Sequence, residues 1–298
     1  MATIAFLAGS ESPAFSLNLW RRMTPGCSGT WGNLTGTADV RSADYVMALD
    51  SLSYSCSSKE MRENIKPEKL ILMGGHPEGH RYYVDMDKEN CAYRIDAGKT
   101  QAFGEWWLKY DYDYLSALQP MQKTAKLGTI VSNAETQPSH IKRKEWLARY
   151  CQKHTNKLDI YGKISPTDVM RPNYKGVLGP LSATDWMSGK EDAYAQYECM
   201  VEFDYSGKHY FSERVFDCLL MYCFMFYWGG GGVEKYLPEE CNFLFDIEGE
   251  GDDILAAIAS PDFYAKKLPA IKEARDLLLN KYQLWPRIHT EIYGATLP

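Results

Sequence analysis

The chain has 298 residues, which is enough for two domains of ordinary size or for one large domain. Its hydrophobic content of 45% and aromatic content of 13% are typical of a globular protein with an ample core. The net charge of −6 argues against a chain that binds nucleic acid or an acidic membrane surface through its bulk charge, so any phosphate binding has to rely on local basic residues.

Three features of the sequence predict a cytoplasmic protein without an integral membrane segment. The first residues, MATIAFLAGSES, lack the basic region and the long apolar core of a signal peptide. The apolar run at residues 219–228 is far too short to span a bilayer. The eight cysteines are scattered and form no CxxC pair, which favours buried free thiols in a reducing compartment over a disulfide framework.

The first half of the chain contains strand-like runs that end in polar or glycine-rich turns. Residues 3–8 predict a first strand, residues 15–23 a short helix, and residues 43–49 a buried strand with Asp50 at its carboxyl end. Residues 70–73 form a third predicted strand, and the loop GGHPEGH follows at residues 74–80. Strands that alternate with helices predict a parallel sheet covered on both faces, where ligands gather at the carboxyl ends of the strands.

The second half repeats this organisation after a predicted linker at residues 120–126, with a domain boundary near residue 124. Residues 127–133 and 158–162 predict strands on either side of a helix that begins near Ser139. Further on, Ser212 is a candidate N-cap of a helix, residues 223–228 read as a strand buried on both faces, and residues 229–232 form a glycine turn. The last long helix carries Leu277, Leu278 and Tyr282 on its apolar face.

The loop that enters the helix after Ser212 is a candidate anion site. Exposed backbone amides and the helix dipole favour a phosphate there, and Arg214 adds a permanent charge with bidentate geometry. The carboxylate of Glu213 is suited to accept a hydrogen bond from a ribose hydroxyl. On spacing alone, a solvated pair of charges in the first helical turn explains the same two residues, and this alternative stays open.

Taken together, the motifs of this stretch resemble the donor-binding segment of the α1,3/α1,4-fucosyltransferases. That family has a Phe-Glu-Asn-Ser-like element, then Tyr-Val-Thr-Glu-Lys before a helix, a Pro-Val-Tyr-Trp-Gly-like strand and a Tyr-x-Pro. The matching residues are Phe203-Asp204-Tyr205-Ser206, Tyr210-Phe211-Ser212-Glu213-Arg214, Phe226-Tyr227-Trp228-Gly229 and Tyr236-Leu237-Pro238. Upstream, the elements that match are Ser132-Asn133, Arg143 near a helix start, the strand ending in Tyr161-Gly162 and the YKGVLG piece with Lys175, so the resemblance covers residues 127–245.

The resemblance implies an α/β protein of GT-B-like fold, with two Rossmann-like domains facing a cleft and a C-terminal helix that returns to the first domain. Residues 1–124 are expected to bind the acceptor, residues 125–270 the nucleotide-sugar, and residues 271–298 to form the returning helix. The implied activity is that of a fucosyltransferase-like, inverting glycosyltransferase, which moves a sugar from a nucleotide-diphosphate donor to a glycan hydroxyl and requires no metal or other cofactor. The implied donor-binding residues are Arg143, Arg214, Glu213, Ser212, Tyr205, Tyr210, Ser132, Asn133, Tyr161, Gly162 and Lys175.

The catalytic base is expected in the loop at residues 74–80. In the fucosyltransferases a Gly-Glu-like turn supplies a carboxylate near the acceptor hydroxyl, and the nearest position here holds His76, with Glu78 two residues further on. An imidazole titrates near neutrality and a buried glutamate can be tuned upward, so either residue is suited to the role, and Glu78 is slightly favoured. A polar loop without a catalytic role is the alternative.

Other candidate sites in the sequence are weaker. The pattern His76-x-Glu78-x-His80 lacks the further ligands of a zinc site. Two Asp-x-Asp pairs, Asp85/Asp87 and Asp111/Asp113, match the metal-binding pair of the other glycosyltransferase fold, but they are expected to be solvated, because a chain with 39 acidic residues contains such pairs by coincidence. The glycine run at residues 229–232 is not followed by the Lys-Ser/Thr of a Walker loop.

Departures from the family pattern leave the donor undecided. The family's asparagine is replaced by Tyr205 and its lysine by Arg214, and the intervening loop is slightly shorter. GDP-fucose and a UDP-sugar such as UDP-xylose are therefore both candidate donors. An alternative of another class is a non-catalytic nucleotide- or sugar-binding protein, which predicts nucleotide binding without turnover of any activated sugar.

Overall fold

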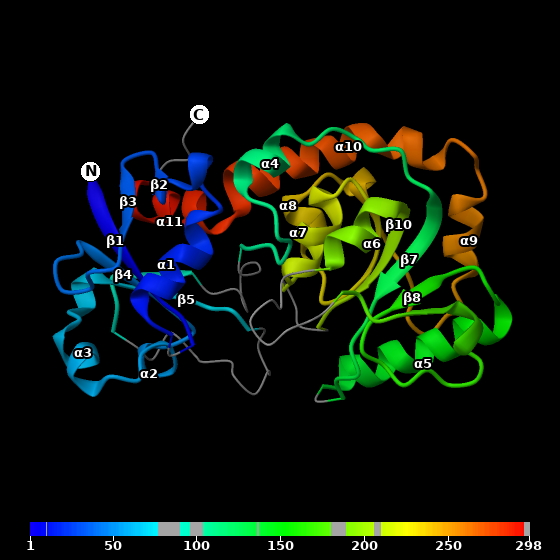
Figure 1. Cartoon of the computed structure of the whole chain (residues 1–298), viewed down its shortest axis with the longest axis horizontal. Coiled ribbons are helices and arrows are strands. Elements are labelled where there is room, and N and C mark those ends of the chain that lie inside the picture. The colour runs from blue at the N-terminus through cyan, green and yellow to red at the C-terminus, as the bar shows by residue number, and fades with distance from the viewer. Residues whose placement is uncertain are drawn as a thin grey trace.

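The computed structural model describes residues 1–9, 11–76, 90–95, 104–135, 137–179, 189–205 and 210–294. These residues form two six-stranded sheets, one from each half of the chain, with helices packed around them (Figure 1). The strand order is β2-β3-β1-β4-β5-β6 in the first sheet and β12-β11-β10-β7-β8-β9 in the second.

The first sheet is parallel except for its edge pair β2–β3. Its inner strands β1, β4 and β5 are apolar and mostly buried, as expected for a sheet that is covered on both faces. The strands are β1 (Ala2–Leu7), β2 (Thr30–Trp31), β3 (Leu34–Thr37), β4 (Tyr45–Leu49), β5 (Leu70–Met73) and β6 (Tyr93–Ile95). The helices of this half are α1 (Pro13–Arg21), α2 (Leu52–Ser55) and α3 (Lys59–Asn64), and a serine hydroxyl caps each of them, from Ser12, Ser51 and Ser58.

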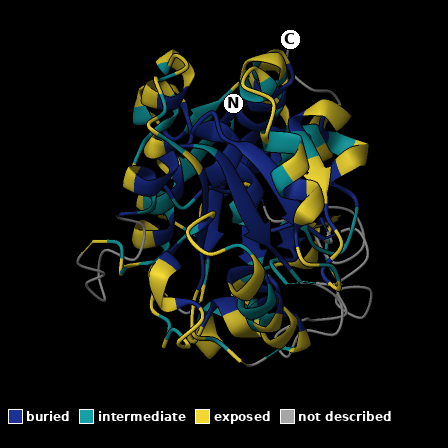
Figure 2. Cartoon of the chain, turned by 90° about the vertical axis from the view of Figure 1, so that its right-hand side faces the viewer, coloured by how far each residue is buried: buried dark blue, intermediate teal, exposed yellow. Residues whose placement is uncertain are grey.

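The second sheet is parallel throughout, and its central strands are buried while exposed residues lie on the outer sides of the helices (Figure 2). The strands are β7 (Ala125–Ile130), β8 (Asp159–Tyr161), β9 (Tyr174–Gly176), β10 (Tyr197–Phe203), β11 (Phe224–Trp228) and β12 (Asn242–Leu244). The helices are α5 (Pro138–Lys153), α6 (Lys190–Gln196), α7 (Glu213–Leu220), α8 (Val233–Tyr236) and α9 (Asp252–Ile258). Along the chain, β8 and β9 are added on one side of β7, and β10, β11 and β12 on the other, so the strand order reverses between β7 and β10.

The C-terminal helices connect the two halves. Helix α10 (Phe263–Leu277) packs on the second half, where the ring of Phe263 lies 4.9 Å from that of Phe224. Helix α11 (Leu284–Tyr293) packs on the first half, where the ring of Trp285 lies 5.0 Å from that of Phe6 (Figure 1). The predicted fold class, two Rossmann-like units with a helix returning to the first, is therefore confirmed.

The single last helix expected from the sequence consists of two helices joined by a π-helical turn at Leu278–Tyr282. The break falls at Gln283, whose backbone is extended with φ −70° and ψ 167°. Its buried side chain donates to the Met23 carbonyl at 3.0 Å and accepts from the Trp285 amide at 3.0 Å, so it caps α11 and ties it to the first half. This change of direction allows one helical segment to cover parts of both units.

Residues 96–124 connect the two sheets, since β6 ends at Ile95 and β7 begins at Ala125. The segment includes α4 (Tyr112–Ala117) and contacts both halves: the Tyr112 amide donates to the Arg22 carbonyl at 2.8 Å, and the Trp107 amide to Asp217 at 2.7 Å. The predicted domain boundary at residue 124 stays a prediction.

Within the described ranges, no helix combines the length and the apolar character needed to cross a membrane. All eight cysteines are free thiols, and six of them are buried.

Candidate functional site

A cavity of about 330 Å³ lies at the carboxyl ends of β7 and β10, where the strand order of the second sheet reverses. In open α/β sheets, ligands bind at such a point of reversal. The first half contributes His76, and the connecting segment contributes Trp107. From the second half, the wall is formed by Ser132, Ala134, Ser139, His140, Arg143, Phe203, Asp204, Tyr205, Ser212, Glu213 and Arg214.

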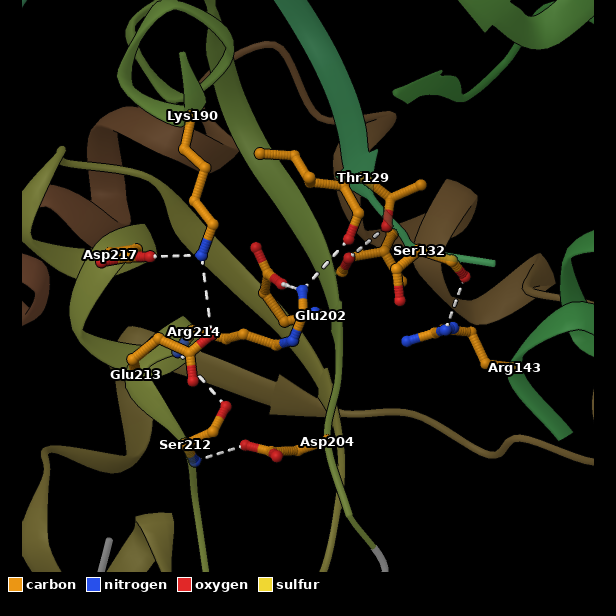
Figure 3. Close-up of polar contacts among 12 residues, drawn as sticks. Thr129, Ser132, Arg143, Lys190, Glu202, Asp204, Ser212, Glu213, Arg214 and Asp217 are labelled. Atoms are coloured by element: carbon orange, nitrogen blue, oxygen red, sulfur yellow. Dashed lines mark hydrogen bonds and ion pairs between the residues drawn. The ribbon is translucent and has the colours of Figure 1, made fainter. Parts of the chain in front are cut away.

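The start of α7 is held in place by Asp204, at the end of β10 (Figure 3). The carboxylate of Asp204 accepts from the Ser212 amide at 2.5 Å and from the Tyr205 amide at 2.9 Å. Ser212 is the N-cap of α7, as predicted, and its hydroxyl accepts from the Arg214 amide at 3.3 Å. Burial raises the pKa of Asp204 to about 6, against the opposing hydrogen bond from the Ser212 amide.

The side chain of Arg214 extends beneath the cavity toward the second sheet. One of its nitrogens donates to the Ile130 carbonyl at 3.1 Å and lies 3.7 Å from the Glu202 carboxyl group. Burial acts to lower the pKa of Arg214, but the carboxyl groups of Glu213 and Glu202 outweigh it and raise the pKa. The guanidinium group is therefore positively charged at all physiological pH values.

Glu202 lies on β10 directly under Arg214 and is fully buried. The Tyr194 hydroxyl donates to one carboxyl oxygen at 2.8 Å, whereas the other oxygen has no hydrogen-bond partner among the described residues. Burial raises the pKa of Glu202 to about 8, with Arg214 acting in the opposite direction. At neutral pH Glu202 is thus mostly protonated, and the carboxyl group of Glu213 is then the main counter-charge of Arg214.

A second arginine, Arg143 on α5, is buried and lines the same cavity, whereas Arg214 is half-buried. It donates to the Ser132 carbonyl at 2.9 Å, and its Nε is buried without a hydrogen-bond partner among the described residues. Burial and the nearby charge of Arg214 lower the pKa of Arg143 to about 10, so it is still charged at pH 7. Two guanidinium groups in one cavity repel each other, which favours an anionic ligand between them.

The helices α5 and α7 both begin at this cavity. Ser139 and His140 in the first turn of α5 line the wall, and no side chain caps this helix. The amides at a helix start and the helix dipole attract negative charge. The cavity therefore combines two helix N-termini, two arginines and the serine hydroxyls of Ser132, Ser139 and Ser212, a set of donors suited to a diphosphate.

His76, which the first half contributes to the wall, is paired with a buried aspartate behind it. Asp50, directly after β4, is 2% exposed, and its carboxylate lies 2.8 Å from Nδ1 of His76 and accepts from the Gly75 amide at 2.6 Å. Because a carboxylate can only accept, this contact requires a proton on Nδ1 of His76. The Asp50 backbone is left-handed, with φ 61°, a conformation that aspartate tolerates better than most residues.

A smaller cavity of about 130 Å³ adjoins this pair. It is lined by Gly75, His76, Glu105, Trp107, Tyr205, Tyr210 and Glu213. The hydroxyl of Tyr210 donates to the Gly75 carbonyl at 3.3 Å and thereby connects the two halves. His76, Trp107, Tyr205 and Glu213 line both cavities, so they mark the place where the cavities meet.

The structure brings together seven of the residues predicted from the sequence in the larger cavity: His76, Ser132, Arg143, Tyr205, Ser212, Glu213 and Arg214. Glu213, expected at a ribose, lies beside the smaller cavity near His76, and its carboxylate is 3.5 Å from the ammonium group of Lys190. Glu78, the favoured base, lies outside the described residues.

Four predicted donor-binding residues do not line either cavity. Asn133 accepts from Lys144 at 3.1 Å, the Tyr161 hydroxyl lies 3.2 Å from that of Tyr197, and Lys175 pairs with Asp159 at 3.1 Å. Gly162 has φ +125°, and a Cβ atom there would lie 1.7 Å from the Val131 carbonyl oxygen. Glycine is therefore required at this position for close packing of β8 against the end of β7.

No group of three or more His, Cys, Asp or Glu side chains in the described parts of the chain is arranged to hold a metal ion. The pair Asp111/Asp113, expected to be solvated, is accessible to solvent and also makes local hydrogen bonds. Asp111 caps α4 by accepting from the Tyr114 amide at 2.9 Å, and Asp113 accepts from the Gly26 amide at 2.8 Å. The pair Asp85/Asp87 and His80 lie outside the described residues.

Sequence reasoning did not identify Trp107, His140, Lys190 or Glu202 as parts of this site. Trp107 belongs to an aromatic-rich stretch without a clear period, and Lys190 lies in no motif that the sequence analysis identified. Glu202 is visible in the sequence as an acidic residue inside the otherwise apolar run CMVEF at residues 199–203, and a buried carboxyl group in such a strand is often functional.

No protein-family model matches the sequence, and no curated protein matches it. Among solved structures, the DNA-modifying enzyme β-glucosyltransferase, studied with and without uridine diphosphoglucose, aligns with TM-score 0.52 and 11% identity over 94% of each chain. The T4 phage BGT in complex with UDP and Mn²⁺ aligns with TM-score 0.52 and 9% identity over 94% of this chain and 95% of that one. An α1,3-fucosyltransferase aligns with TM-score 0.49 and 12% identity over 95% and 92% of the two chains.

The fold is GT-B. At these low identities the likeness concerns the backbone arrangement and not the chemistry. In the GT-B arrangement seen here, the cavity lies between the two Rossmann-like units and receives side chains from both.

Proposed function

We propose that this protein is an inverting glycosyltransferase that transfers a sugar from a nucleoside-diphosphate donor to an acceptor hydroxyl without a metal ion. One observation carries the proposal: two arginines of the second unit line a cavity to which the first unit contributes His76, the partner of the buried Asp50. The first set of groups is suited to a leaving diphosphate and the second to an attacking hydroxyl.

The diphosphate would bind between Arg143 and Arg214, at the starts of α5 and α7. The buried Nε of Arg143, the protonated state of Glu202 and the mutual repulsion of the two guanidinium groups all support a negative ligand at this place. Negative charge accumulates on the leaving phosphate as the bond to the sugar breaks. Fixed cations therefore stabilise the transition state more than the ground state, which is the role a divalent ion has in other enzymes.

His76 is the proposed general base. Its Nδ1–H donates to Asp50, which fixes the ring and stabilises the imidazolium that forms when Nε2 accepts a proton. This assignment shifts the preference from Glu78 to His76, because the pairing of His76 with a buried carboxylate supports a role as base. Glu78 remains the alternative.

The reaction is a single displacement. Nε2 of His76 takes the proton of the acceptor hydroxyl, the hydroxyl oxygen forms a bond to the anomeric carbon of the sugar, and the bond from that carbon to the diphosphate oxygen breaks. The electron pair leaves with the diphosphate, whose charge is neutralised by Arg143 and Arg214. Attack from the side opposite the leaving group inverts the anomeric centre.

Two donors are the first to test. The motif from Tyr210 to Arg214, which lies at the junction of the two cavities, supports GDP-fucose by its resemblance to the fucosyltransferases. The uridine diphosphoglucose of a structural relative with the same fold supports a UDP-sugar as the alternative.

The test is to incubate the purified 298-residue chain with a panel of GDP- and UDP-sugars, with and without EDTA, and to measure the nucleotide released. We expect one donor to be hydrolysed slowly without an acceptor, at the same rate in both conditions. Release that requires manganese would contradict the metal-independent mechanism. Nucleotide binding without turnover of any sugar, even with glycan acceptors, would favour a non-catalytic binding protein.

A further inference from the structure

Trp107 stands at the junction of the two cavities and belongs to neither Rossmann-like sheet. It lies in the segment that connects the two halves. The arginines line only the larger cavity, whereas Gly75 and Tyr210 line only the smaller one. A group bound where the cavities meet would therefore lie beside both Trp107 and His76 and next to the diphosphate site, which is the position of the transferred sugar in the proposed function.

Three contacts from different parts of the chain fix Trp107. Its amide donates to the Asp217 carboxylate on α7 at 2.7 Å, and its indole nitrogen donates to Glu105 at 2.8 Å. The ammonium group of Lys190 lies 5.0 Å from the centre of its ring, within the range of a cation–π interaction. Main chain, ring edge and ring face are thus each held by a charged group.

The two carboxyl groups among them are buried, and each has a further hydrogen-bond partner. Asp217 is 0% exposed and accepts from Lys190 at 2.9 Å, and Glu105 is 8% exposed and also accepts from the Trp20 indole at 2.9 Å. Burial raises the pKa of both carboxyl groups, and Lys190 opposes this effect at Asp217. Since burying charge is costly, a buried set that converges on one tryptophan indicates that the exact placement of this ring matters.

We propose that Trp107 is a specificity-determining residue that recognises the transferred sugar as a pyranose ring. A rigid aromatic ring matches the apolar C–H face of a pyranose, and it makes this contact at little cost in conformational entropy because its own position is already fixed. Glu105, Asp217 and Lys190 are positioning residues that hold the ring. This inference rests on the proposed function.

The test compares Trp107→Ala and Trp107→Phe with the wild-type chain in calorimetric titrations of UDP, UDP-glucose, GDP and GDP-fucose. For the nucleotide that the wild type binds, we expect the alanine variant to weaken binding of the sugar nucleotide about tenfold relative to the nucleoside diphosphate alone. The phenylalanine variant should retain most of the discrimination. If the alanine variant does not fold, Trp107→Leu keeps the apolar volume without the ring and takes its place.

A matched control is Trp106→Phe. Trp106 is the neighbouring residue but is fully buried, lines neither cavity, and donates its indole hydrogen to the Tyr110 carbonyl at 2.8 Å. This variant should lower the stability of the protein without changing the ratio between its affinity for the sugar nucleotide and its affinity for the nucleoside diphosphate alone. An unchanged ratio in Trp107→Ala, whether both affinities fall or neither does, would overturn the inference. Failure of the wild type to bind any nucleotide would overturn the proposed function and this inference with it.

Discussion

The buried carboxyl group of Glu202 gives a direct test of the electrostatics of the site. Replacing it by glutamine keeps the shape and the hydrogen bond from Tyr194 but removes the ionisation. If Glu202 is protonated at neutral pH, the amide mimics its native state. The variant Glu202→Gln should then fold with near wild-type stability at pH 5, and its stability should respond to pH differently from that of the wild type.

The size of the effect follows from the two pKa values. In the unfolded chain Glu202 ionises near its ordinary value of 4.5, whereas in the native protein it holds its proton up to about 8. Between these values the folded state binds more protons than the unfolded state, so the wild-type free energy of unfolding falls as the pH rises. At about 1.4 kcal/mol per pH unit, the loss between pH 5 and pH 9 is on the order of 4 kcal/mol.

The assay is urea unfolding of both proteins at pH 5, 7 and 9. The stability of the wild type minus that of Glu202→Gln should become more negative with rising pH and stop changing above pH 8. A control is Glu198→Gln, four residues earlier on the same strand, where the carboxylate is partly exposed and pairs with Lys126 at 2.6 Å. Parallel pH profiles for the wild type and Glu202→Gln would refute the reasoning, because Glu202 would then be ionised in the native state.

Three further predictions concern the reaction and the packing behind it. Arg214→Ala or Arg143→Ala should lower kcat/KM by a factor that corresponds to a loss of about 2–4 kcal/mol of transition-state stabilisation. The rate is measured as nucleotide release from the donor, and an unchanged turnover would remove the diphosphate assignment. His76→Gln and Asp50→Asn should slow transfer to an acceptor about 100-fold or more while leaving the calorimetric donor affinity unchanged; near wild-type rates in both would direct attention to Glu78. Gly162→Ala should lower the urea midpoint by the equivalent of more than about 2 kcal/mol, since its Cβ would overlap a backbone carbonyl of the neighbouring strand, and a wild-type midpoint would show that the strand end relaxes easily.

The parts of the site that the sequence predicted are those with a local signature. Ser212 caps α7 because a hydroxyl precedes an apolar helical period, and Arg214 follows it in the first turn, so both can be read within a few residues. His76 was found because its loop follows a short apolar strand. Each of these inferences needs only the rule that ligands bind at the carboxyl ends of strands and at the N-termini of helices.

The pairings within the site needed information that a single sequence does not carry. His76 meets Asp50 only because β4 and β5 are neighbours in register, which brings the Asp50 amide to the Met73 carbonyl at 2.7 Å. The family pattern suggested Lys175 as a donor ligand, but here its ammonium group is paired with Asp159 on the neighbouring strand. Contacts between side chains on neighbouring strands depend on the register of the strands and on the direction of the side chains. Neither can be inferred from the spacing of residues in one sequence.

The charge state of the cavity follows from the order of the strands. Because β7 lies next to β10, the Ile130 carbonyl at the end of one strand and Glu202 on the other both contact Arg214, although the strands are far apart in sequence. Burial of Glu202 on a central strand keeps its carboxyl group protonated at neutral pH, and a protonated carboxyl group does not neutralise Arg214. Above pH 8 the same residue would ionise and compete with a phosphate for the guanidinium group. Donor affinity should therefore fall above pH 8 in the wild type but not in Glu202→Gln, which links the burial of one strand residue to the function of the site.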